Sequence, residues 1–241
     1  MQNYRALLAT RKTNGAMVNR LLVFVLLAGI ASTSGAQVRR RIPIPAEPET
    51  WVTGSVGLFN GNTVADGVTN SEWDLGQATN PQVRLAVERS IQGQAHMSFG
   101  VAGTYTHAPF TYVGSNGGSS CFQCAAHLDL VSLGLSFHAG GGPGLHQVLE
   151  ASVGALQYRN LTRDSDKTPL APVGGNIDPY FTFGYGFGYT LSPVTEVSVV
   201  QDFGLALHER TGLTSEQSNT LRLRTIRLNF RYGFGNRIRK K

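Results

Sequence analysis

The sequence predicts an all-β chain: an eight-stranded antiparallel up-and-down transmembrane β-barrel that follows a cleaved signal peptide. Three observations lead to this prediction. Large apolar residues alternate with small or polar ones over eight separate stretches. The connections between these stretches are alternately long and short, as in barrels with loops at one end and tight turns at the other. The only strongly apolar run, near the start of the chain, is too short for a transmembrane helix.

Residues 1–36 are predicted to be the signal peptide. A basic stretch precedes the apolar run Leu21 to Ala31, and small residues follow it up to a cleavage site before Gln37. This run has about 11 residues, whereas a helix needs about 20 to cross hydrocarbon. If the chain starts at Met17, the leader has a more typical length. The alternative interpretation of the apolar run is a buried helix in the protein core. Residues 37–50 are rich in proline and charge, which predicts a periplasmic N-terminal arm.

Alternation with a period of two predicts strands at 51–60, 82–91, 95–107, 126–138, 145–158, 179–191, 195–208 and 219–235. The barrel therefore occupies 51–235, and a basic tail follows at 236–241. Three short connections carry turn residues and predict hairpins, at 92–94, 139–144 and 192–194. The long connections are 61–81, 108–125, 159–178 and 209–218. An even strand number places both chain ends at the turn end.

One predicted strand carries aromatic residues on one face and glycine or threonine on the other. Its aromatic residues are Phe181, Phe183, Tyr185, Phe187 and Tyr189. The last strand repeats the pattern with Phe230, Tyr232 and Phe234. Further upstream, the sequence "LRLR" changes the pattern near Thr225, which predicts a bulge or the end of the embedded band.

The opposite strand faces carry small residues and seven charged ones: Arg84, Glu88, Glu150, Glu196, Asp202, Arg227 and Arg231. Seven charges exclude an apolar lipocalin-type cavity. A soluble barrel with this polar face toward water is also excluded, because such a surface normally carries far more charge. Charged residues make up only 15% of the chain, and lysine is absent between Gln37 and Asp166. The apolar faces are therefore predicted to meet lipid, and the seven charges to pair inside a lumen that side chains fill.

The net charge of +6 does not indicate nucleic-acid binding. Without residues 1–36 the chain has 17 basic and 15 acidic residues, a net charge of +2. Many of the remaining basic residues lie in two short clusters, at 39–41 and 237–241, and no basic stripe with interleaved aromatic residues remains.

With this leader, strand number, loop rhythm and last strand "LNFRYGFG", the chain resembles the small bacterial outer-membrane β-barrel family, the eight-stranded barrels of the outer-membrane protein A and X type. The resemblance implies a Gram-negative outer membrane, extracellular loops, periplasmic termini, and contact with outer-membrane lipids and lipopolysaccharide. It also implies that the assembly machinery recognises the last strand by a terminal aromatic residue. Phe234 is the nearest match, although "GNRIRKK" follows it.

The long loops contain several candidate sites. Cys121 and Cys124 are predicted to form a local disulfide rather than a redox or metal site. Trp73 is predicted to anchor at the outer membrane interface, with ligand contact as the alternative. The sequon at 160–162 is attributed to chance. The loop acids are predicted to be solvated, with divalent cations as the alternative ligands: Asp66, Glu72, Asp74, Asp164, Asp166 and Asp178.

An enzyme alternative comes from the resemblance, since some small outer-membrane barrels remodel lipid A with His and Ser two residues apart. His96 and Ser98 have this spacing, but they follow a periplasmic turn, are expected to point into the lumen, and have no matching Glu. Ser132, His138 and Asp202 share the lumen face, which polar satisfaction explains more simply. No catalytic, cofactor-binding or metal-binding residue is therefore predicted.

The functional prediction is a non-catalytic outer-membrane barrel with a largely plugged polar lumen and a structural or surface-interaction role. A narrow passage for small solutes is the alternative, and a lipid A-modifying enzyme is a weaker one. The sequence does not indicate a loop ligand or an oligomeric state.

Overall fold

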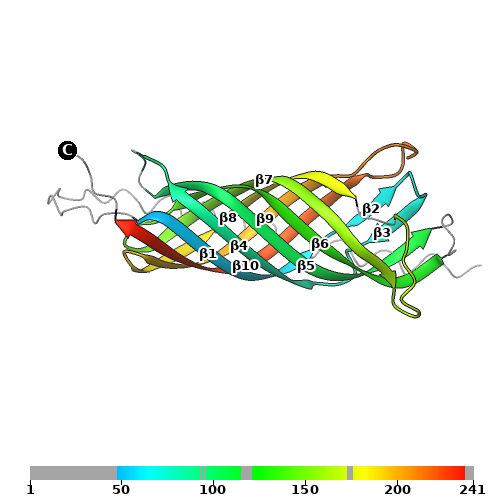
Figure 1. The fold of residues 1–241 in the computed structure, drawn as a ribbon, viewed down its shortest axis with the longest axis horizontal. Helices are drawn as coiled ribbons and strands as arrows, with labels where there is room; N and C mark the ends of the chain where they lie inside the picture. The colour runs from blue at the N-terminus through cyan, green and yellow to red at the C-terminus, as the bar shows by residue number, and fades with distance from the viewer. Residues whose placement is uncertain (1–47, 93, 95, 115–120, 173–175, 237–241) are drawn as a thin grey trace, which may run out of the picture. The chain divides into compact units, whose positions relative to one another are not determined.

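A computed structural model describes residues 48–92, 94, 96–114, 121–172 and 176–236. Eight long strands form a closed ring in which every neighbouring pair is antiparallel, and β1 pairs with both β4 and β10. The strands are β1 (Pro48–Asn60), β4 (Asn80–Ser90), β5 (Met97–Gly114), β6 (Cys121–Gly140), β7 (Gly144–Arg163), β8 (Ile177–Ser192), β9 (Thr195–Leu207) and β10 (Thr220–Asn236). The predicted eight-stranded up-and-down barrel is confirmed (Figure 1). The predicted signal peptide lies outside the described residues.

The start of β1 and the end of β10 lie side by side at the turn end of the barrel, where Pro48 is paired with Asn236. Strand β1 thus includes the last three residues of the predicted N-terminal arm. The tight turn between β6 and β7 depends on Gly142 and Gly144, whose φ angles of +123° and +75° other residues rarely adopt.

The register is regular through the middle of the barrel. Among the described residues, the register shifts lie in the loop-end half of β5–β6 and β6–β7 and at the turn end of β8–β9. Strand β10 pairs with β1 and β9 without a register shift near Thr225, so of the two alternatives predicted there the bulge is wrong, which leaves the end of the embedded band. Leu221 and Leu223 continue the inward alternation of Thr225 and Arg227. The sequence pattern changes there because the inward residues become apolar, while alternate residues continue to point inward and outward as before.

The loop end of the barrel is taller than predicted. Strands β5, β6 and β7 extend beyond the expected bounds, so most of the predicted loop at 108–125 is strand. The first long loop contains a hairpin of β2 (Thr63–Asp66) and β3 (Ser71–Asp74), and β3 pairs with the far end of β5. Figure 1 shows this hairpin at the end of the barrel opposite the start of β1 and the end of β10.

Candidate functional site

The outer surface carries an apolar belt that includes every long strand. One member from each strand, from β1 round to β10, is Leu58, Leu85, Val101, Leu135, Val153, Phe183, Phe203 and Leu228; all eight are exposed. The aromatic side chains predicted to face lipid also project outward: Phe181, Phe183, Tyr185, Phe187, Tyr189, Phe230, Tyr232 and Phe234. A monomeric soluble protein rarely exposes more than a few hundred Å² of contiguous apolar surface. A closed belt of this kind matches the hydrocarbon-facing band of a transmembrane barrel.

The inner face toward the turn end contains the charged network, centred on Glu150 of β7. Its Oε2 accepts a hydrogen bond from Arg227 Nη2 at 2.5 Å and lies 3.3 Å from Arg84 Nη1. Its Oε1 lies 3.3 Å from His138 Nδ1. Arg227 Nε also donates to Asp202 Oδ2 at 2.5 Å. One connected group of polar and charged side chains therefore links β4, β6, β7, β9 and β10 across the lumen.

A second group of the charged network joins Arg231 to Glu88, with 3.1 Å between Nη2 and Oε2. Ser98 and Ser136 both donate hydrogen bonds to the Glu88 carboxylate, at 2.8 and 3.0 Å. The Arg231 guanidinium lies 4.2 Å from the ring centroid of Trp51, which is within the range of a cation–π contact. The buried carboxylate thus has partners on several strands, which offsets the cost of removing it from water.

Glu196 is the one predicted lumen carboxylate with no arginine against it in the described structure. Its Oε2 lies 3.5 Å from His146 Nε2, and its Oε1 lies 4.0 Å from His138 Nε2. Sequence reasoning did not single out His146. All seven predicted lumen charges lie on the inner face, and only Asp202 keeps appreciable exposure, at 14% of its side chain.

A small cavity of about 50 Å³ lies above the charged network, toward the loop end. Its polar lining includes Arg84, Glu150, Asp202 and Arg227, and its apolar lining includes Leu156. A water molecule needs roughly 10–15 Å³ of such space. The cavity therefore has room for only a few water molecules.

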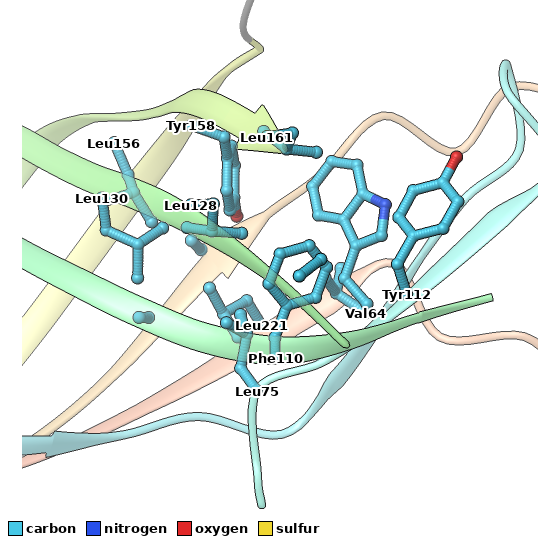
Figure 2. Close-up of a cluster of buried hydrophobic side chains, with 14 of the residues drawn as sticks. Val64, Leu75, Phe110, Tyr112, Leu128, Leu130, Leu156, Tyr158, Leu161 and Leu221 are labelled. Carbon is cyan, nitrogen blue, oxygen red and sulfur yellow. The ribbon is translucent and has the colours of Figure 1, made fainter. Parts of the chain in front are cut away.

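The loop half of the interior is filled by apolar side chains, here named the cap cluster: Phe59, Val64, Trp73, Leu75, Ala108, Phe110, Tyr112, Cys121, Ala126, Leu128, Leu130, Leu156, Tyr158, Leu161, Leu170, Tyr180, Ala206 and Leu221. Figure 2 shows 14 of these side chains, which converge from the barrel wall and from the β2–β3 hairpin. Trp73 is fully buried there, 5.2 Å from the ring centroid of Tyr158. The prediction that Trp73 anchors at the membrane interface is therefore wrong.

A buried histidine between two aspartates lies beside the cap cluster. His208 follows β9 at the loop end, and its Nδ1 is 3.0 Å from both carboxylate oxygens of Asp178. Its Nε2 is 3.9 Å from Asp66 Oδ2 on the hairpin. Burial alone would lower the pKa of His208, but its bonds with Asp178 and Asp66 raise this pKa to about 9. A protonated His208 therefore ties the hairpin to the barrel wall at neutral pH.

Sequence reasoning treated Asp66 and Asp178 as solvated loop acids, and both are buried instead. Strand parity offered a signal: Asp178 is two residues before the inward Tyr180, and His208 is two residues after the inward Ala206. Among the residues that the structure describes, no group of histidine, cysteine, aspartate and glutamate is arranged to hold a metal ion.

The residues considered for catalysis do not assemble. His96 lies exposed in the turn before β5, so the prediction that it points into the lumen is wrong. Ser98 points inward and bonds to Glu88. Ser132 bonds to Thr104 at 2.6 Å and lies six residues from His138 on the same strand, roughly 20 Å away.

The two cysteines lie at the start of β6. The structure joins Cys121 to Cys124 by a disulfide, with 5.7 Å between their Cα atoms, a usual separation for this bond. This short cross-link lies at the loop end, where Cys121 belongs to the cap cluster and Cys124 packs against it.

No protein-family model matches the sequence, and no curated protein matches it. Solved structures of similar shape include Neisserial surface protein A, which is 14% identical with a TM-score of 0.49; the match covers 77% of this chain and 97% of that one. The outer membrane protein OprG from Pseudomonas aeruginosa is 10% identical, with a TM-score of 0.47 and coverage of 79% and 97%. The attachment invasion locus protein Ail of Yersinia pestis, in complex with a heparin analogue, is 12% identical, with a TM-score of 0.39 and coverage of 77% and 99%.

These values are too low to transfer a function, so the function has to be inferred from this chain's own residues. Within the described part of the chain, no helix has the length and apolar character needed to cross a membrane.

Proposed function

We propose that the protein is an integral outer-membrane barrel whose lumen is closed and whose role is structural or in surface interaction, without catalysis. The observation that carries this proposal is the combination of an exposed apolar belt with buried ion pairs. In water this arrangement would be inside out, because it exposes leucine and phenylalanine and buries arginine and glutamate. In a bilayer both faces have suitable surroundings. The loop end then faces the outside and both ends of the barrel chain face the periplasm.

Two successive layers support a closed lumen. The charged network crosses the barrel near the turn end, and the cap cluster fills the loop end. The small cavity lies between them, lined by residues of both layers. A solute passing through would have to separate Arg227 from Glu150 and displace buried aromatic side chains, so the closed barrel is favoured over an open channel.

The outward aromatic residues at the end of β10 are the proposed contact with the assembly machinery. Phe230, Tyr232 and Phe234 are exposed and lie at alternate positions up to the turn end of the last strand. Outer-membrane lipids and lipopolysaccharide are the proposed surroundings of the apolar belt. For the loop end no particular ligand is proposed.

Electrophoresis in SDS with and without boiling tests membrane embedding. A closed barrel in detergent keeps its shape and migrates faster when it is unboiled, and the protein should be recovered with the outer-membrane fraction. A protein recovered from the soluble periplasmic fraction, with one mobility under both conditions, would contradict the proposal.

A narrow passage for small solutes is a second candidate, favoured only by the cavity beside Arg84 and Asp202. Planar-bilayer recording separates the two candidates. A closed barrel gives no steady conductance, and removal of the β2–β3 hairpin should leave it low because the charged network still crosses the lumen. Steady conductance by the intact protein would favour the passage.

A further inference from the structure

Two arginines lie at the loop-end border of the apolar belt on β10. The outward positions of this strand are Arg222 and Arg224, followed by exposed apolar residues from Ile226 to Phe234. Charged side chains therefore give way to apolar ones between two successive outward positions, Arg224 and Ile226. Because outward residues two apart project from the same face, the two guanidinium groups leave the barrel wall on the same side, about 7 Å apart at their base.

The surroundings of this pair are apolar. On β9, Arg224 is paired with Phe203 and Arg222 with Leu205, and both partners are exposed members of the apolar belt. On β1, Arg224 is paired with Asn60. Arginine side chains lay their methylene groups along apolar surface and extend the charged end toward water or headgroups. Phe203 and Leu205 supply that surface.

Neither arginine has an acidic partner within the described residues. Besides its strand pairing, Arg222 forms a hydrogen bond through its backbone nitrogen, which donates to Asn62 Oδ1 at 2.6 Å. Arg89, the outward-facing arginine of β4 at the turn end, contrasts with them because it forms an ion pair with Glu49. The loop-end border thus carries two guanidinium groups that no acidic residue of the described structure neutralises. Both are therefore available to bind an anionic ligand.

We propose that Arg222 and Arg224 bind the phosphate groups of lipid A, whose acyl chains cover the adjacent surface of Phe203 and Leu205. This inference rests on the proposed function, since it requires the belt to be embedded with the loop end in the outer leaflet. Guanidinium groups bind phosphate oxygens in a bidentate manner, and each basic residue near an anionic headgroup contributes favourably to membrane contact. An amphiphile that combines phosphate with acyl chains fits both halves of the surface.

The test compares unfolding midpoints in phosphatidylcholine vesicles that contain lipid A, dephosphorylated lipid A, phosphatidylglycerol or no addition. The midpoint is read from the loss of fast migration in SDS as temperature rises. The variants are Arg222→Gln/Arg224→Gln, the charge-keeping Arg222→Lys/Arg224→Lys, and Arg89→Gln as a control at the opposite border.

Lipid A should raise the midpoint of the native protein and of Arg89→Gln, and more so than phosphatidylglycerol or dephosphorylated lipid A. The double Gln variant should lose most of this rise, and the double Lys variant should keep part of it. An equal rise in the double Gln variant, no rise in the native protein, or an equal rise with dephosphorylated lipid A would overturn the inference. Failure of the native protein to insert would instead refute the proposed function itself.

Discussion

Glu150→Gln offers a sharp test of the charged network. The substitution keeps the size of the side chain and removes the negative charge that faces Arg84 and Arg227. Breaking a buried ion pair by removing one partner costs about 3–5 kcal/mol. Arg227 keeps Asp202 as a partner, whereas Arg84 loses the only ion pair that it forms within the described residues, so the lower value applies. The free energy of unfolding should fall by about 3 kcal/mol.

The same chemical change at an exposed ion pair provides the control. Glu49 pairs with Arg89, and their side chains are 42% and 74% exposed. Glu49→Gln should cost no more than about 1 kcal/mol, since water screens the interaction. Urea unfolding of each variant in lipid vesicles, followed by tryptophan fluorescence, gives both values in one assay.

Adding Arg84→Met to Glu150→Gln should recover part of the lost stability, because it removes the buried cation that the first change leaves unpaired. Losses below about 1 kcal/mol for Glu150→Gln, equal to those of Glu49→Gln, would refute the reasoning. Such a result would mean that water reaches the network and that the lumen is not closed.

Three further predictions concern the cap, strand packing and the belt. The bond of His208 with Asp178 stabilises the cap cluster fully below pH 6.5, and this stabilisation should be lost as the pH rises through about 9, where His208 loses its proton. Tryptophan fluorescence should show the cap cluster loosening over that pH range. The variant His208→Gln should abolish the transition. Gly186→Ala should lower stability by about 1–3 kcal/mol, since an added Cβ would overlap the Val199 carbonyl oxygen, and urea unfolding measures the loss. Phe183→Lys should cost about 2–4 kcal/mol in vesicles if this residue faces the bilayer centre, and a neutral effect would contradict an outward lipid contact.

Alternation along the chain was sufficient to predict the eight strands and their inner faces. Within the belt, large apolar residues recur at alternate positions of each strand, and the positions between them therefore point inward. This reasoning holds for β8, where Phe183 and Phe187 point out while Gly184 and Gly186 point in. It depends only on the two-residue repeat of a strand, which tertiary contacts do not alter.

The cap cluster could not be predicted in the same way. At the loop end the inner positions are apolar and the outer ones polar, so the alternation reverses its chemistry while the strand keeps its parity. For this reason the alternation around Leu221 and Leu223 predicts a bulge or the end of the embedded band, although the strand continues with unchanged parity. Strands β2 and β3 have only four residues each, too few to establish a period, and burial of Trp73 depends on where the hairpin folds.

The hairpin of the first loop has a further consequence through its pairing with β5. It precedes β4 in the chain but joins the sheet on the far side of β4, so it cannot dock until β4 and β5 have taken their places. The loop-end portion therefore folds last, as a small unit in water on top of the strands that lie in the bilayer. Denaturants that act from the aqueous side should melt this unit first, and sequence change can accumulate within it while the portion in the bilayer stays intact.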